Sequence, residues 1–181
     1  LSNLSLRGTI ATDGTFIAGF VIAGDSPKTV LIRAAGPSLV DFGLTKAHPN
    51  PRITLYQGQT IVAANSDWSQ AANAADIAAT ARRFGAFPFP ASGTDAAMLV
   101  TLSPGLYSVF VQGEAAGQGG IVLVELYDAD VQGPTAPPNP PVLDPLLPTV
   151  TVSGPATEIV EGASGTFVFK RTGGTAQALS V

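Results

Sequence analysis

The chain has 181 residues, a length that suits one domain or two small ones and is enough to bury a core. Hydrophobic residues make up 45% and charged residues 12%, so the composition is not that of a disordered protein, and a net charge of -4 leaves no basic surface for nucleic acid. The chain has no cysteine and one histidine, His48, which excludes disulfides, thiolate metal sites and two-histidine mechanisms. We therefore expect an all-β protein, rich in glycine and proline turns, that is not an enzyme.

Residues 1–131 are predicted to form an eight-stranded β-sandwich or jelly roll. The predicted strands are short, rich in β-branched or aromatic residues, and bounded by turn residues. They are 4–10, 16–22, 29–35, 52–56, 60–64, 97–102, 106–112 and 121–127.

Three turns and one helix complete this predicted domain. The turns at 12–14, 57–59 and 103–105 contain glycine or Pro-Gly, which predicts antiparallel hairpins, with positive φ at glycine in the first two. An alanine-rich stretch between Ser69 and Phe84 ends in two arginines and predicts one helix inserted into the β pattern.

A linker and a short β segment are predicted to follow. Residues 132–148 hold seven of the fifteen prolines and predict a semi-rigid, extended spacer. Residues 149–181 return to a β pattern, with apolar residues at Val150, Val152, Phe167, Val168 and Phe169. Because this segment is too short to close a sandwich of its own, those residues are candidates for assembly with another chain or with further domains.

The location follows from two further observations. No apolar run approaches the roughly 18 to 20 residues of a membrane-spanning helix, so no membrane insertion is expected. The chain begins with Leu1 rather than methionine, and we expect either a signal that has been removed or a piece of a longer chain. Both alternatives place the protein outside the cell or on its surface.

Residues 1–131 resemble a β-sandwich module of very large exported bacterial surface proteins. The resemblance is carried by GFVI at 19–22, KTVLIRAAGP at 28–37, NSDW at 65–68 and LSPGLY at 102–107. The last motif is also similar to pre-peptidase C-terminal domains, in which a Pro-Gly turn precedes an aromatic-bearing strand. These resemblances imply a non-catalytic extracellular part.

Residues 149–181 resemble the opening of a Calx-beta domain, an immunoglobulin-like sandwich associated with calcium. The matching motifs are VTV at 150–152, EG at 161–162, TFVF at 166–169 and RTGG at 171–174. The resemblance implies an early calcium-binding glutamate at Glu161. The acidic partners of that glutamate in the family fall beyond Val181.

A second possible calcium site involves Asn65, Asp67 and Asp95, because oxygen ligands of this kind suit calcium. The alternative is that Asp67 or Ser69 caps the predicted helix.

The large aromatic residues also have two possible roles, in ligand binding or in the core. Trp68, with Tyr56, Tyr107 and Tyr127, is either a platform for surface carbohydrate or part of the core.

Other polar residues receive structural interpretations. Arg33 lies within an apolar run, so a buried pair with Glu125 is favoured over a ligand role. His48 is predicted to be a surface residue, and Asp128 and Asp130 to be solvated loop carboxylates.

Together these observations predict a structural extracellular protein, either the subunit of a homopolymeric filament or a segment of a large adhesin, assembling through the linker and the tail. The alternative is a calcium-dependent, carbohydrate-binding accessory module of an exported enzyme.

Overall fold

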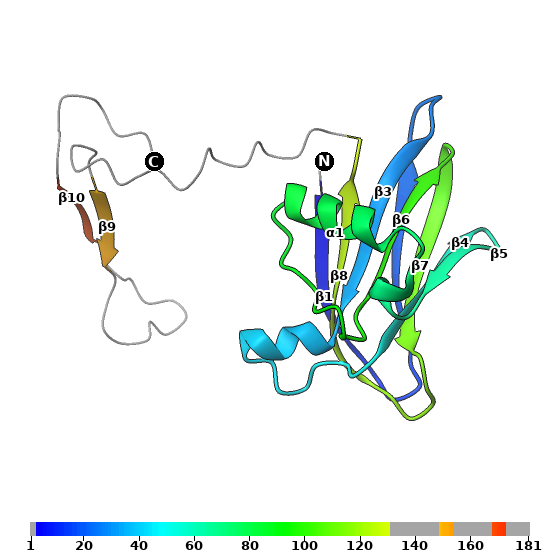
Figure 1. Ribbon diagram of the computed structural model, residues 1–181, viewed down its shortest axis with the longest axis horizontal. Coiled ribbons are helices and arrows are strands. Elements are labelled where there is room, and N and C mark those ends of the chain that lie inside the picture. The colour runs from blue at the N-terminus through cyan, green and yellow to red at the C-terminus, as the bar shows by residue number, and fades with distance from the viewer. Residues whose placement is uncertain (1–2, 131–148, 154–167, 173–181) are drawn as a thin grey trace, which may run out of the picture. The chain divides into compact units, whose positions relative to one another are not determined.

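The computed structural model describes residues 3–130, 149–153 and 168–172, and the chain divides into two compact units, Leu1–Ala136 and Pro137–Val181 (Figure 1). The first unit is built from eight strands. They are β1 (Asn3–Ile10), β2 (Phe16–Ile22), β3 (Lys28–Ala35), β4 (Pro51–Gln57), β5 (Thr60–Asn65), β6 (Ala96–Leu102), β7 (Gly105–Gly113) and β8 (Gly120–Asp128). Each predicted strand is confirmed to within one residue at either end.

The strands form two antiparallel sheets that face each other. The first sheet has the order β1-β8-β3-β6 and the second the order β2-β7-β4-β5. Most consecutive strands therefore belong to opposite sheets, the arrangement of an eight-stranded jelly roll. The predicted fold class, an all-β sandwich or jelly roll with one inserted α-helix, is confirmed.

Only one of the three predicted hairpins is present. Gly58, at φ 60°, turns the chain between β4 and β5, which pair with each other. The turns at 12–14 and 103–105 instead carry the chain from one sheet to the other. In the first of them Asp13, at φ 57°, takes the left-handed conformation that was expected at Gly14. Turn chemistry sets the local backbone angles, but it does not determine which strand becomes the partner.

The first sheet is covered on both faces. On its inner face, side chains such as Val30 and Ile32 of β3 and Val124 of β8 join the core between the sheets. On its outer face, Leu31 and Tyr127 lie under a second cluster that includes Ile77. This double burial explains why β3 reads as a nearly continuous apolar run rather than an alternating one.

The outer layer contains the predicted helix. Helix α1 (Ala74–Arg83) follows a 3-10 turn, η2 (Trp68–Gln70), and buries Ile77 and Ala81 on the sheet. A second 3-10 helix, η1 (Pro37–Phe42), was not predicted. The expectation that Asp67 or Ser69 caps the helix is wrong, because the helix begins later and Asn73 stands at its N-cap, where no side chain caps the backbone.

The second unit contains a two-stranded antiparallel sheet formed by β9 (Thr149–Ser153) and β10 (Val168–Thr172). The backbone register pairs Val152 with Phe169 and Val150 with Arg171. The predicted linker at 132–148, and Glu161 and Phe167 of the predicted tail, lie outside the described residues. In the described part of the chain, no helix is long and apolar enough to cross a membrane.

Candidate functional site

The core of the sandwich is incompletely covered along the seam between β1 and β2, the edge strands of the two sheets. Four large side chains from these strands pack on the core but remain only partly buried: Leu4, Leu6, Phe16 and Phe20. In the described part of the chain, β1 pairs only with β8 and β2 only with β7. This seam therefore combines incompletely buried apolar side chains with two backbone edges that face outward.

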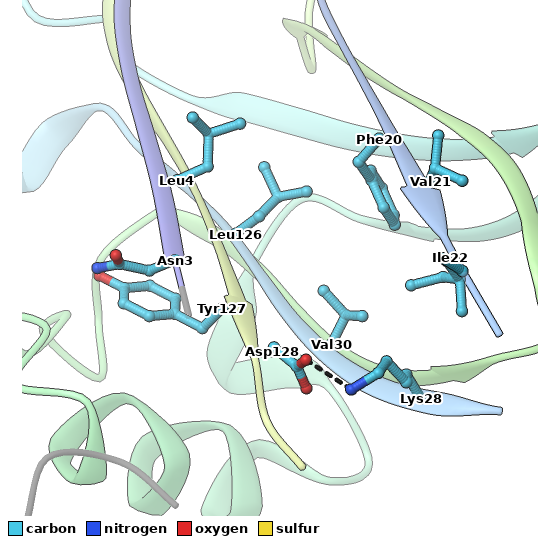
Figure 2. A pocket seen from close by; sticks show the side chains of 11 residues that line it. Asn3, Leu4, Phe20, Val21, Ile22, Lys28, Val30, Leu126, Tyr127 and Asp128 are labelled. Atoms are coloured by element: carbon cyan, nitrogen blue, oxygen red, sulfur yellow. Dashed lines mark hydrogen bonds and ion pairs between the residues drawn. The ribbon is translucent and has the colours of Figure 1, made fainter. Parts of the chain in front are cut away.

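A groove of about 290 Å³ lies along this seam (Figure 2). Figure 2 shows Leu4 and Leu126 on one side, Phe20, Val21 and Ile22 on the other, and Val30 between them. The lining residues come from β1, from β2 and the residue after it, from the start of β3 and from the end of β8. They are Asn3, Leu4, Phe20, Val21, Ile22, Ala23, Lys28, Val30, Leu126, Tyr127 and Asp128.

Away from this groove, the seam is closed by contact between the two strands. A side-chain carbon added at Gly8 of β1 would lie 2.3 Å from the ring of Phe16 in β2, so the ring occupies the space that only glycine leaves free. The seam thus tapers from an open groove near Leu4 and Phe20 to a tight contact at Gly8.

Charged side chains lie at one end of the groove. Lys28 Nζ donates a hydrogen bond to Asp128 Oδ2 at 2.7 Å, and this carboxylate raises the pKa of Lys28. Asp130 Oδ2 accepts a hydrogen bond from the Thr29 backbone N–H at 2.8 Å. The expectation of a solvated loop carboxylate is wrong for Asp128, which lies in β8 and binds Lys28, whereas Asp130 is exposed after the strand as expected.

The opposite seam, between β5 and β6, also holds a hollow, of about 450 Å³, but polar side chains bind to the backbone along it. The Ala97 N–H of β6 donates to Asn65 Oδ1 at 2.9 Å, and Asn73 Nδ2 donates to the Leu99 carbonyl at 3.0 Å. The Trp68 N–H also donates to the Asp95 carbonyl at 2.9 Å. Because these bonds occupy backbone groups on the outer side of β6, this edge is blocked against another strand. The two seams therefore differ in chemistry, because the groove at β1/β2 has the more apolar lining and the backbone edge of β6 is covered by polar side chains.

A buried ionic cluster lies on the outer face of the first sheet. Arg33, which is 1% exposed, pairs with Glu125 at 3.1 Å, and Glu125 also accepts a hydrogen bond from the Tyr127 hydroxyl at 2.7 Å. Arg33 Nη2 donates to the Phe87 carbonyl at 2.6 Å, and the guanidinium lies 3.9 Å from the centre of the Phe89 ring. The predicted Arg33–Glu125 pair is confirmed.

The electrostatics of this cluster follow from its burial. Loss of water contact lowers the pKa of Arg33, while Glu125 acts in the opposite direction. Loss of water contact also raises the pKa of Tyr127, and the hydrogen bond to Glu125 adds to that effect. The cluster fixes the outer layer on the sheet and leaves no charged group of its own open to a ligand.

The proposed calcium ligands Asn65, Asp67 and Asp95 come from neighbouring segments, but the side-chain oxygens of Asn65 and Asp95 have other partners. Asp67 Oδ1, in contrast, is buried without a hydrogen-bond partner among the described residues. The Asp95 carboxylate accepts hydrogen bonds from the N–H groups of Gly36 and Ser38 and from the Ser38 hydroxyl, at 2.8, 3.2 and 2.5 Å. Asn65 Oδ1 is bound to β6, as described above. Among the described residues, no group of three or more acidic, histidine or cysteine side chains is arranged to hold a metal. The calcium site stays a prediction, as does the role of Glu161.

The aromatic residues do not form a shared platform. Tyr107 is buried in the inner core and stacks on Phe20, whereas Tyr127 belongs to the outer cluster. Trp68 also packs against the outer cluster, and its indole N–H donates to the Pro90 carbonyl at 3.0 Å. These residues serve the core, and a carbohydrate role for Trp68 stays a prediction.

His48 is fully buried, so its predicted surface position is wrong. Its backbone N–H donates to the Ile121 carbonyl, and its Nδ1 accepts a hydrogen bond from the Asn50 N–H at 3.2 Å. A side-chain carbon at Gly36 would lie 2.4 Å from the His48 carbonyl oxygen. The loop that contains His48 is buried because Gly36, after β3, and Gly120, in β8, allow its backbone to approach closely. Loss of water contact lowers the pKa of the imidazole.

The second sheet, in contrast to the first, has an outer face that no other element of the described first unit covers. Ile17 of β2, Leu106 of β7 and Ile61 of β5 are 57%, 72% and 58% exposed. Between them the rings of Tyr56 and Phe110 pack together, with centroids 4.8 Å apart. Neither this face nor the groove was predicted from the sequence, because both depend on which strands become neighbours.

The predicted assembly residues are described only in part. Val150 and Val152 lie in β9, and Val168 and Phe169 lie in β10. Their part in assembly stays a prediction.

Comparison with known proteins finds similarity among solved structures but not among families or curated proteins. No family model and no curated protein matches the chain. Among solved structures, the chain is similar to the pre-peptidase C-terminal domain of a collagenase from Bacillus anthracis. The TM-score is 0.41 and the sequence identity 17%, over 69% of this chain and 89% of that one. The Calx-beta resemblance of the tail stays a prediction.

Proposed function

We propose that the protein is a non-catalytic, extracellular structural subunit that assembles head to tail, each copy placing its tail, residues 149–181, in the β1/β2 groove of the next. The observation that carries this proposal is the open groove itself. Its walls are apolar side chains of the core, and its rims are the outward edges of β1 and β2. A strand added there gains main-chain hydrogen bonds and covers Leu4 and Phe20 at the same time.

The tail provides a segment suited to that groove. The β9–β10 pair is a two-stranded sheet, a size that is marginally stable in water without further packing. Its sequence supplies Val150, Val152, Val168 and Phe169 as apolar residues. The resemblance of the tail to the opening of a Calx-beta domain agrees with a segment that needs a partner to complete it.

The spacing along the chain permits transfer to a neighbour. Residues 132–148 span up to roughly 55 Å when extended, at about 3.3 Å per residue. A contact that joins the tail of one copy to the sandwich of the next is heterologous, and it produces an open filament unless the rotation closes a ring. The extracellular location is supported by the resemblance of residues 1–131 to modules of exported bacterial proteins.

Disulfide trapping tests this proposal, because the chain contains no cysteine of its own. In the full chain we would combine Val21→Cys, at the groove, with Val152→Cys, in β9. A disulfide forms only when the two Cα atoms come within about 7 Å, so a ladder of cross-linked chains on a non-reducing gel is expected.

Val40 provides a matched control for the trapping experiment. It has the same side chain as Val21 and nearly the same exposure, 59% against 60%, but lies in η1 away from the groove. The pair Val40→Cys and Val152→Cys should give no ladder. If the disulfide instead joins the groove and the tail of the same chain, no ladder forms. That result would show that the tail folds back on its own sandwich, and it would contradict the proposal.

A further inference from the structure

The outer face of the second sheet, called here the open face, is a second apolar surface, which meets the groove at Val21. It consists of the outward side chains of the strands β2, β7, β4 and β5, which pair in that order. The register places Ile17 opposite Phe110 and Tyr56 opposite Ile61, so these side chains form rows across the sheet. Exposed apolar side chains that gather on one sheet mark an interaction surface rather than ordinary scatter.

The open face is also almost free of charge. Arg52 is the only charged residue in its four strands, and it pairs with Glu114 at 3.2 Å at one end of β4. Close by, Gln112 donates to the Thr15 hydroxyl at 2.9 Å. The face therefore has an apolar centre with polar pairs at one end, which is the anatomy of a protein interface.

We propose that the open face packs against the open face of a second copy of this chain. The charge distribution favours this occupant. The chain carries a net charge of -4, so two copies repel each other over most surfaces, but a contact between two uncharged faces brings no like charges together. Two sheets packed face to face also interdigitate their side chains in the way that the two sheets of a sandwich do.

The size of the face determines the strength of this contact. Four strands spaced about 4.8 Å apart and about seven residues long, at about 3.4 Å per residue, give a face of roughly 19 by 24 Å. A symmetric pair then buries roughly 900 Å², below the roughly 1,200 Å² at which stable interfaces begin. Isolated copies pair weakly, whereas copies already aligned in a filament pair readily because their local concentration is high. Pairing through the open face joins two filaments side by side.

The test compares full-length variants by sedimentation velocity up to about 1 mM and by negative-stain microscopy. Ile61→Glu and Leu106→Glu place a carboxylate on the open face. We expect each to weaken lateral self-association by about tenfold or more, because the charge becomes buried without a partner against an identical face. Val40→Glu is the matched control, since Val40 is 59% exposed and Ile61 is 58% exposed. It should pair as the unchanged chain does, and melting curves verify that all three variants are folded.

The outcomes separate this inference from head-to-tail assembly. Paired filaments that become single in the Ile61→Glu and Leu106→Glu variants support the inference. Weak dimers in the absence of filaments would also support the inference if the Ile61→Glu and Leu106→Glu variants no longer form them. The same result would contradict the proposed head-to-tail assembly. Filaments that are single in the unchanged chain, monomers alone at about 1 mM, or an equal effect of Val40→Glu would each overturn it.

Discussion

Asp95 connects two parts of the first unit through a single carboxylate. It is fully buried and accepts hydrogen bonds from the Gly36 and Ser38 backbone and from the Ser38 hydroxyl, so it fixes the start of η1 on the sandwich. In Asp95→Asn one acceptor oxygen is replaced by an amide that faces a donor. We expect the free energy of unfolding, measured in urea, to fall by about 2–3 kcal/mol.

The same variant tests the calcium hypothesis. The exposed residue Asp25 serves as a control, and Asp25→Asn should change the free energy of unfolding by less than about 0.5 kcal/mol. Because the loss at Asp95 arises from hydrogen bonds within the protein, it should be equal in calcium and in chelator. A stabilisation of the unchanged chain by calcium that disappears in Asp95→Asn would instead identify this residue as a metal ligand.

His48 should make the stability of the fold depend on pH. Burial lowers its pKa in the folded protein below the ordinary value of 6.5, so just below that pH the unfolded chain binds a proton that the folded chain does not. The free energy of unfolding should therefore fall as the pH drops below 6.5, by at most about 1.4 kcal/mol per pH unit. Urea titrations between pH 8 and pH 5 measure this slope. Because His48 is the only histidine, His48→Gln should reduce the slope of the free energy of unfolding against pH. An unchanged slope in this variant would show that carboxylates cause the pH dependence.

Single residues differ in how well the sequence predicts their surroundings. The Arg33–Glu125 pair could be predicted because a guanidinium within an apolar strand requires a carboxylate nearby. The burial of His48 could not be predicted. It depends on the contact of its loop with Gly36 and with Gly120, which come close to His48 only in the folded chain.

At the scale of elements, the strands were predictable and their neighbours were not. Short runs rich in β-branched or aromatic residues, bounded by turn residues, locate each strand, because such runs depend on local composition and burial and not on the identity of the partner strand. The turn at 12–14 resembles a hairpin in sequence but crosses between sheets. The groove brings together the start of β1, the end of β2, the start of β3 and the end of β8, which become neighbours only through this crossing.

The protection of the β6 edge gives a prediction at this scale. Asn73 donates to the Leu99 carbonyl, so Asn73→Ala removes that bond and exposes an outward backbone group of an edge strand. We expect a loss of about 1 kcal/mol in the free energy of unfolding and an earlier onset of light scattering on heating. Gln112→Ala is the control, because it also removes one side-chain hydrogen bond but leaves the β6 edge covered. An equal rise in scattering for both variants would show that the asparagine does not protect the edge.

At the scale of the whole molecule, assembly is expected to depend on the second unit. Deleting residues 149–181 removes β9 and β10 and leaves the eight strands of the first unit and both of its core clusters intact. In the proposed assembly each groove is filled by the tail of another copy. We therefore expect the truncated chain to be a monomer by light scattering, with no filaments in negative stain, under conditions in which the full chain assembles.

The melting temperature shows whether the truncated chain is monomeric because it lacks the tail or because it is unfolded. The truncated chain should melt as a folded domain, but below the assembled full chain, because filling the groove stabilises the folded sandwich by mass action. Adding the separate peptide 149–181 to the truncated chain should raise the melting temperature again, and Leu4→Asp, which places a charge in the groove wall, should prevent that rise. Filaments of the truncated chain would contradict assembly through the tail. A symmetric contact between two open faces closes at a dimer, so another surface of the sandwich would then have to build the filament.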